Sequence, residues 1–237
     1  MSAVNELWIE LARRAGIELT GEQHQKLSRY LDLLFDANAR MNLTRITDRP
    51  AAELQHVADA LTVLPHLPGG AIRVADVGSG GGVPGIPLAI ARPDATFLLI
   101  ESTKKKAAFL KQAIDALDLK NASVSEWRAE EVGHSNSRET FDVALARAVA
   151  TLAWLAEWCL PLVKKGGKML AMKGPKVAEE LPEAVKPIKL AGGGEAVVHP
   201  VELPGTDHRV IVDVAMFARS DKRLPRPATQ AKGKPLA

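Results

Sequence analysis

Four glycines follow a short apolar run near residue 80, and this arrangement can hold a nucleoside. The stretch reads Val74-Ala75-Asp76-Val77-Gly78-Ser79-Gly80-Gly81-Gly82-Val83-Pro84-Gly85. Glycine lets a backbone turn tightly and approach a ligand without a Cβ atom in the way, and the first turn of the next helix offers free N–H groups to that ligand. The alternative is a glycine-rich turn that binds nothing. The strand–loop–helix context favours the binding site.

An acidic residue, Glu101, ends the next predicted strand, 23 residues after Gly78. A carboxylate at this place can accept both hydroxyls of a ribose, although a solvated strand end would have the same pattern. Nicotinamide cofactors and S-adenosylmethionine both fit such a site. The frame Gly78-x-Gly80-x-Gly82 directly after the strand, with Asp76 near the strand's end, favours S-adenosylmethionine. The chain has no GxxxxGK(S/T) motif, so we do not expect ATP hydrolysis.

The fourth predicted strand, residues 141–147, should end beside the methyl acceptor. It carries neither the Asn/Asp-Pro-Pro-aromatic motif of adenine-N6 enzymes nor the Pro-Cys pair of cytosine-C5 enzymes. Arg147 cannot act as a general base because it stays protonated, but it can bind a carboxylate, a phosphate or the N7 atom of guanine. Guanine N7 carries no proton, so its methylation needs only in-line positioning of the reacting atoms. We therefore expect an acceptor with an available lone pair.

Two further side chains that can do chemistry, His56 and Asp59, are three residues apart and share one face of a predicted helix. They could pair, with His56 pointing at the donor or the acceptor; a surface or capping histidine is the alternative. No group of residues has metal-ligand spacing, so we expect no metal. Cys159, the only cysteine, lies in an apolar stretch and is predicted to be a small buried side chain.

A run of three cations, Lys104-Lys105-Lys106, opens a predicted helix. Cations there oppose the positive end of the helix dipole. A solvated charge run is one explanation, and contacts with phosphates beside the ligand cleft are the other. Arg128, Lys173 and Arg209 are at strand or loop positions compatible with the same rim. The pattern favours a distributed surface for RNA phosphates.

Aromatic residues make up only 4% of the chain. This low content argues against base-stacking platforms of the kind found in single-strand-binding proteins. We therefore predict that Trp127, Trp154 and Trp158 are core or packing residues.

The elements that must position these residues change in kind near residue 70. Residues 1–69 have helical periodicity, with a capping box at Thr20-Gly21-Glu22-Gln23 and a third helix from Pro50 to just before Pro65. Beyond them, short apolar runs alternate with helix-length segments, which predicts a parallel sheet with helices on both faces. Two later runs, 195–203 and 208–218, indicate an antiparallel hairpin. We predict an α/β, Rossmann-like fold with a mostly parallel seven-stranded sheet that ends in this hairpin, after an N-terminal helical extension.

Length and charge suggest three parts: a helical extension (1–69), a main domain (70–218) and a tail (219–237). The 237-residue chain has a formal net charge of +3, but the tail alone holds six basic residues and one acidic residue. We expect this tail to be mobile or loosely docked and to attract RNA phosphates without regard to sequence. No apolar run approaches the ~20 residues of a membrane span, and no signal peptide is evident. We expect a cytoplasmic protein with no membrane contact.

The sequence resembles the bacterial small-subunit rRNA guanine-N7 methyltransferase family, RsmG, also called glucose-inhibited division protein B. The resemblance covers about residues 20–217, and the stretch from Asp76 to Leu88 is its most specific part. The other matching pieces are Met41-Asn42-Leu43-Thr44, His56-Val57-Ala58-Asp59-Ala60-Leu61, Lys105-Lys106, Phe109-Leu110, Arg128-Ala129-Glu130, Ala146-Arg147-Ala148, Lys173-Gly174 and His208-Arg209. Ala60 and Glu101 depart from the family, in which Ser and Asp are common at these positions.

The resemblance implies methyl transfer from S-adenosylmethionine to N7 of a guanine in the decoding-region loop of 16S rRNA, with the rRNA or the small ribosomal subunit as partner. The donor-binding residues that it implies are Gly78, Gly80, Val83, Glu101 (ribose), Ala129 and Glu130 (adenine), and Arg147 (methionine end). The candidate catalytic residues are His56, Arg147 and Lys173. The candidate RNA-binding residues are Lys105, Lys106, Arg128, Lys173 and Arg209.

Two other functions remain open at this point. A methyltransferase of the same fold could act on another RNA, a small molecule or a protein. A non-enzymatic module could bind a nucleoside or RNA, although the intact glycine loop with Glu101 argues against it. Nothing in the sequence demands an oligomer, so we expect a monomer.

Overall fold

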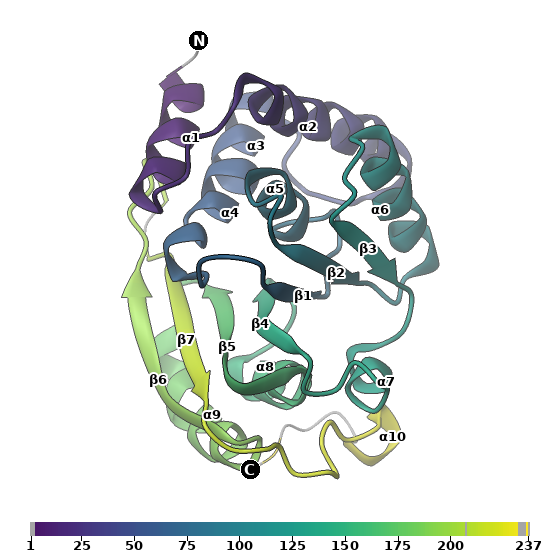
Figure 1. Ribbon diagram of the computed structural model, residues 1–237, viewed down its shortest axis with the longest axis vertical. Helices are drawn as coiled ribbons and strands as arrows, with labels where there is room; N and C mark the ends of the chain where they lie inside the picture. Colours follow the sequence, from purple (N-terminus) through teal and green to yellow (C-terminus); the bar gives the residue numbers. More distant parts are fainter. Residues whose placement is uncertain (1–2, 207, 232–235, 237) are drawn as a thin grey trace. The chain divides into compact units, whose positions relative to one another are not determined.

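The strands of the chain alternate with helices, as the sequence predicts (Figure 1). The computed structural model describes residues 3–206, 208–231 and 236. In this part of the chain the strands form a seven-stranded sheet of order β3-β2-β1-β4-β5-β7-β6, which confirms the predicted fold class. The chain divides into two compact units: the first is Met1–Ala71 with Ser79–Glu126, and the second is Ile72–Gly78 with Trp127–Ala237.

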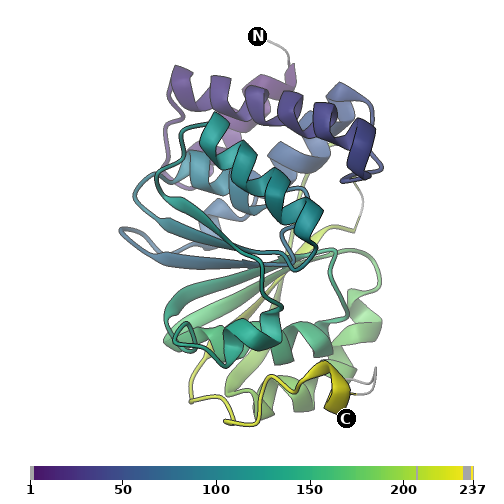
Figure 2. The same cartoon turned by 90° about the vertical axis from the view of Figure 1, so that its right-hand side faces the viewer.

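The first unit holds the N-terminal helices and one parallel pair of strands, β2 and β3. The capping box predicted at Thr20 is present, because the Thr20 hydroxyl accepts from the Gln23 N–H and the Gln23 side chain accepts from the Thr20 N–H. Asn42, in the left-handed region, ends the long helix α2. Helix α2 packs on α5 and α6, and Figure 2 shows α2 (purple) beside α6 (teal). The elements are α1 (Ala3–Arg14), α2 (Gly21–Met41), α3 (Arg49–Ala52), η1 (Glu53–Ala58), α4 (Asp59–Leu61), η2 (Leu64–His66), α5 (Gly85–Ala91), β2 (Thr96–Ile100), α6 (Lys104–Ala116) and β3 (Ala122–Ser125).

The helix predicted from Pro50 contains a wide turn that the sequence did not indicate. Residues 49–52 are α-helical, Glu53–Ala58 form a π-helical turn, and Asp59–Leu61 return to the α form. The Trp8 indole N–H donates to the Glu53 carbonyl oxygen at 3.0 Å, at the start of this turn. Single π-turns occur frequently at functional sites, and this one carries His56.

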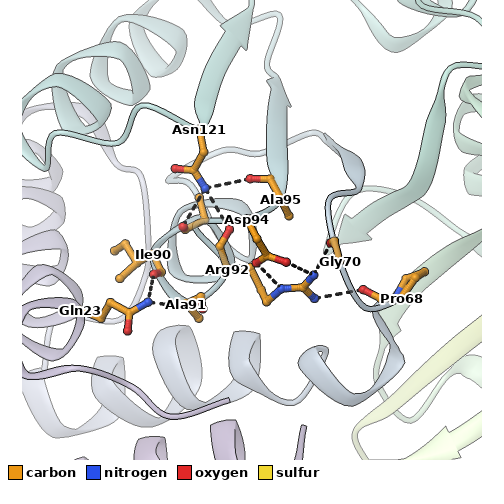
Figure 3. Close-up of polar contacts among 10 residues, drawn as sticks. Gln23, Pro68, Gly70, Ile90, Ala91, Arg92, Asp94, Ala95 and Asn121 are labelled. Atoms are coloured by element: carbon orange, nitrogen blue, oxygen red, sulfur yellow. Dashed lines mark hydrogen bonds and ion pairs between the residues drawn. The ribbon is translucent and has the colours of Figure 1, made fainter. Parts of the chain in front are cut away.

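Side-chain amides and one guanidinium hold the end of α5 and the approach to β2 in the first unit (Figure 3). The Gln23 amide donates to the Ile90 carbonyl at 2.8 Å, and the Asn121 amide donates to the Ala95 carbonyl at 3.0 Å. Arg92 forms a two-pronged pair with Asp94, with both N···O distances at 2.8 Å. The Gln23 contact satisfies a carbonyl group that the end of α5 leaves without an intrahelical partner.

The second unit holds the central strands of the sheet. Strands β1, β4 and β5 are parallel, and β7 runs antiparallel to both β5 and β6. The predicted terminal hairpin is therefore confirmed, and Figure 1 shows β6 and β7 side by side. The elements are β1 (Arg73–Val77), α7 (Ala129–Gly133), β4 (Phe141–Arg147), α8 (Leu152–Cys159), η3 (Leu160–Leu162), β5 (Val163–Lys173), α9 (Val177–Leu190), β6 (Gly193–Pro200), β7 (Val210–Met216) and α10 (Ala228–Ala231).

The tail, which the sequence predicts to be mobile or loosely docked, makes defined contacts over residues 220–226. The Arg138 guanidinium donates to the carbonyl oxygens of Ser220 and Asp221 at 3.1 and 3.0 Å. Arg226 pairs with the fully buried Glu157 at 2.7 Å. Lys232 and Lys234 of the tail lie outside the described residues.

Among the residues that the structure describes, no helix is long and apolar enough to cross a membrane.

Candidate functional site

The loop after β1 adopts a conformation that depends on glycine. Gly78, Gly80 and Gly82 have φ angles of 73°, 56° and 95°, in the left-handed region that L side chains rarely adopt. A Cβ atom on Gly78 would lie 2.6 Å from Val149 Cγ2. The glycines of this loop therefore carry no side chain that would block a ligand from the backbone. No larger residue fits at Gly78 without displacing Val149.

Glu101 joins the glycine loop to the start of α6 within the first unit. Its side chain is buried, and Oε2 accepts a hydrogen bond from the Gly80 N–H at 3.0 Å, while Oε1 accepts from the Thr103 N–H at 2.7 Å. The structure therefore brings together two residues that the sequence placed in one site. A carboxylate can accept about four hydrogen bonds, so Glu101 retains capacity for ribose hydroxyls.

Helix α2 supports the glycine loop through a contact that the sequence did not reveal. The Tyr30 hydroxyl donates to the Gly81 carbonyl oxygen at 2.7 Å. A Cβ atom on Gly81 would lie 3.0 Å from the Leu34 side chain. Tyr30 is a buried residue of α2, and its hydroxyl partner lies 51 residues away along the chain, so only the fold shows this contact.

His56 is buried in the π-helical turn and has a fixed neighbour in the segment after α2. Its Nε2 lies 2.9 Å from Thr44 Oγ1, and the same oxygen accepts the Ile46 N–H at 3.0 Å. The Thr44 N–H in turn donates to Asn38 Oδ1 at 2.8 Å. Thr44 belongs to the motif Met41–Thr44, so the structure brings two of the predicted motifs into contact.

In the second unit, Arg147 ends β4 and is followed by a loop in an unusual conformation. Ala148 has a φ of 55° without being glycine, and such conformations are found at ligand sites and other constrained positions. The side chain of Val149 lies next to the position that a Cβ atom on Gly78 would occupy. The end of β4 therefore meets the end of β1 within this unit.

Lys173 is held inside the second unit. Its ammonium group donates to the Ala150 carbonyl at 2.9 Å and pairs with Glu180 at 2.7 Å, and both side chains are largely buried. Glu180 also accepts the Leu152 N–H at 2.6 Å. This pair fixes the loop after β4. Lys173 therefore has a supporting role in addition to the roles in catalysis and phosphate binding that the sequence predicts.

The remaining predicted residues differ in exposure. Ala129 is buried and Glu130 half-buried in the first turn of α7, and Val83 is half-buried in the glycine loop. Lys105 and Arg128 are exposed, while Lys106 and Arg209 are half-buried. Exposure leaves the first two cations available to a polyanion.

The predictions for the aromatic residues and for Cys159 have different outcomes. Trp154 and Trp158 stack on each other with ring centroids 5.2 Å apart, as expected of packing residues. Trp127 is 56% exposed, so it is not a core residue. Cys159 is fully buried; burial, with a smaller contribution from the charge of Asp76, raises the pKa of its thiol. It is no nucleophile, as predicted.

Known proteins match the chain over most of its length. Residues 23–208 match the family GidB, described as rRNA small subunit methyltransferase G. The chain is 39% identical over 236 residues to ribosomal RNA small subunit methyltransferase G of Leuconostoc citreum, covering 98% of this chain and 99% of that one. It is 40% identical over 239 residues to the protein of the same name from Pelotomaculum thermopropionicum, with 100% of both chains covered.

A solved structure supports the fold. TYW2 of Pyrococcus horikoshii, in complex with MeSAdo, has a TM-score of 0.52 and 20% sequence identity, and the match covers 73% of this chain and 65% of that one. The family follows from the sequence matches, which extend over most of the chain. The chain belongs to the ribosomal RNA small subunit methyltransferase G family.

Proposed function

We propose that this protein transfers a methyl group from S-adenosylmethionine to N7 of a guanine in the decoding-region loop of 16S rRNA. The observation that carries the proposal is the left-handed glycine loop tied by its Gly80 N–H to the buried carboxylate of Glu101. A bare backbone next to a positioned acid fits the ribose and methionine parts of the donor. Membership of the rRNA methyltransferase family supports the choice of acceptor.

The donor site in this proposal uses the residues that the resemblance indicates. Glu101 accepts the ribose hydroxyls, and Arg147 binds the methionine carboxylate, with which its guanidinium can form two parallel hydrogen bonds. The backbone along the glycine loop lies against the donor, and α7 contacts the adenine. Bound S-adenosylmethionine supplies an electrophilic methyl group. The further donor-site residues are Gly78, Gly80, Val83, Ala129 and Glu130.

The acceptor needs positioning rather than a base. The new bond joins N7 to the methyl carbon while the carbon–sulfur bond breaks, so no proton leaves the guanine. In-line alignment of the two atoms is the main requirement. We propose that His56, held by Thr44 at 2.9 Å, contributes to this alignment and that Arg147 helps to place the reacting groups.

The RNA surface in this proposal consists of cations that contact phosphates. Lys105, Lys106, Arg128 and Arg209 are its members, because each is exposed or half-buried. We leave Lys173 out of both the catalytic and the phosphate-binding groups, since its ammonium is already paired with Glu180. We further propose that the protein acts as a monomer in the cytoplasm.

The experiment that tests the function is methyl transfer from labelled donor to 16S rRNA from a strain that lacks this gene. We expect one guanine in the decoding-region loop to gain a methyl group and to become cleavable by borohydride and aniline. Label in another RNA or a small molecule, with none in 16S rRNA, would transfer the assignment to that substrate. If the protein binds the donor but no acceptor becomes labelled, the result would favour a non-enzymatic binding module.

The donor site has its own test. We expect Gly78→Asp to abolish binding of S-adenosylmethionine in calorimetry, because the new side chain meets Val149 and needs a left-handed backbone. The matched control is Gly69→Asp, at a glycine with no neighbour within 4 Å of an added Cβ. A folded Gly78→Asp variant that keeps wild-type donor affinity would show that the donor binds elsewhere.

A further inference from the structure

Trp127 presents an indole ring on the surface of the second unit. It is 56% exposed, whereas Trp8 is fully buried and Trp154 and Trp158 stack on each other. A tryptophan side chain carries a large apolar area and is enriched where proteins bind partners. A single exposed apolar residue can occur by chance, so the neighbourhood of Trp127 decides its meaning.

The backbone next to Trp127 is fixed. The Arg128 N–H donates to Glu131 Oε2 at 2.7 Å, and the Arg128 carbonyl accepts the N–H groups of Glu131 and Val132 at 3.0 Å each. These bonds close the first turn of α7 directly after Trp127. The exposed indole and the exposed guanidinium are therefore carried on adjacent residues of a backbone with little freedom.

The same two residues come immediately before Ala129 and Glu130, which the proposed function places at the donor's adenine. A flat apolar ring followed by a cation matches what unpaired RNA offers, because its bases expose flat faces and its backbone is negatively charged. Guanidinium groups also stack on bases or bind phosphates. S-adenosylmethionine carries a sulfonium cation, so the positive charge of Arg128 favours a polyanion over the donor as the occupant.

We propose that Trp127 stacks on an unpaired base of the rRNA loop that contains the target guanine, and that Arg128 contacts the adjacent phosphate. This inference rests on the proposed function and names the part of the substrate that the exposed pair recognises. The low aromatic content of the chain does not oppose it, since one ring at the correct place is enough to hold one base.

Binding measurements with two variants and a control test this inference. We expect Trp127→Ala to raise the Kd for a decoding-region RNA hairpin about tenfold, and Trp127→Phe to raise it less, because a smaller ring still stacks. The Kd for S-adenosylmethionine should stay unchanged in both. The control is Phe217→Ala, which removes another exposed aromatic ring of the second unit (67% exposed) and should leave the affinity for RNA unchanged.

Fluorescence separates stacking from a structural effect. We expect RNA to quench wild-type tryptophan emission, and the quenching to be much smaller in Trp127→Phe at saturating RNA. Wild-type RNA affinity in Trp127→Ala would overturn the inference. Weakened donor affinity with unchanged RNA affinity would also overturn it, by assigning the ring to the adenine.

The same assay keeps the inference separate from the function on which it rests. If the wild-type protein methylates 16S rRNA while Trp127→Ala retains its KM for that RNA, the inference alone fails. If the wild-type protein does not methylate 16S rRNA, the proposed function fails and the inference fails with it.

Discussion

At the scale of single residues, the proposed role of Glu101 in donor binding predicts that one substitution changes both donor affinity and the stability of the first unit. Its two oxygens accept N–H groups from Gly80 and Thr103. In Glu101→Gln, one oxygen is replaced by an NH₂ group that cannot accept. We expect a loss of about 1–2 kcal/mol in the free energy of unfolding and about tenfold weaker donor binding, measured by urea denaturation and calorimetry. Glu18→Gln, at an exposed acid of the same unit, should change neither; equal effects in both variants would contradict this role.

Cys159 gives a second prediction at this scale. Because burial raises the pKa of its thiol, almost no thiolate forms at neutral or mildly alkaline pH, and the thiolate is the reactive form. We expect a thiol reagent at pH 8 to modify the native protein slowly and the urea-denatured protein rapidly. The chain has one cysteine, so the reaction reports on this residue alone. Rapid modification of the native protein would show that Cys159 is accessible.

The sequence predicted some residues of the site and not others, for a physical reason. Strand ends and glycine loops recur at fixed spacings in this fold class, so Gly80 and Glu101 were placed together correctly. Tyr30 and Thr44 act through contacts that depend on how distant segments pack, and no local pattern reports them. Trp127 lies between a strand and a short helix, where no periodicity indicates burial, and its exposure was therefore missed.

At the scale of elements, the buried pair Lys173–Glu180 connects α9 to the end of β5 and to the loop after β4. Glu180→Gln would leave the ammonium of Lys173 without its counter-ion in a largely buried place. We expect a loss of about 3 kcal/mol in the free energy of unfolding and slower methyl transfer, since Arg147 directly precedes this loop. The control is Glu183→Gln, an exposed position on the same helix. Denaturation and initial rates measure the two effects; wild-type stability in Glu180→Gln would show that the pair is dispensable.

Arg92 and Asp94, after α5, give a prediction about pH. The hydrogen bonds from Arg92 lower the pKa of the Asp94 carboxyl below its usual range. A carboxyl whose pKa is lower in the folded state stabilises the protein above its unfolded pKa of about 3.9, and this contribution disappears as the pH falls through the folded value. We expect Asp94→Asn to lower the free energy of unfolding at pH 7 by less than about 1 kcal/mol, because the pair is partly exposed.

This deficit of Asp94→Asn should vanish when denaturation is followed to acidic pH. Asp36→Asn, at an exposed position of α2, should match the wild type throughout. A deficit that persists at pH 2 would mean that Asp94 acts through its shape rather than its charge.

The predicted elements were largely correct because hydrophobic alternation is a local signal. The order of the last strands could not be predicted from local patterns. Strand β7 pairs with both β5 and β6, and a hairpin pattern alone does not say which of its two strands joins the rest of the sheet. The π-helical turn at His56 was not predicted. Its hydrogen bonds span five residues instead of the four of an α-helix, and it depends on packing such as the Trp8–Glu53 contact.

At the scale of the whole molecule, two of the basic residues in the tail form ion pairs within the protein, whereas the sequence suggested that the tail cations attract RNA phosphates. Of the tail cations, Arg223 pairs with Asp221 and holds the pKa of that carboxyl at about 2, and Arg226 pairs with the buried Glu157. We expect Arg226→Ala to lower the free energy of unfolding by about 3–5 kcal/mol, because it removes the counter-ion of a buried carboxylate. Lys222→Ala, which removes an exposed cation of the same segment, is the control.

This result also changes the expected effect of removing residues 219–237. We expect such a truncation to lower the melting temperature as well as the affinity for RNA, so RNA affinity must be compared at a temperature where both proteins are folded. A truncated protein with wild-type stability would show that the contacts of residues 220–226 contribute little.

The division of the chain into units has a consequence for how the protein can be made. Strand β1 and Gly78 belong to the second unit, yet the chain before and after them belongs to the first. The chain therefore passes between the units at residues 71–72, 78–79 and 126–127, and the second of these crossings lies inside the glycine loop. A ribosome that has completed residues 1–126 has produced the whole first unit but only one strand of the second. That strand can pair with β4, its partner in the second unit, only after the ribosome has reached Phe141, where β4 begins.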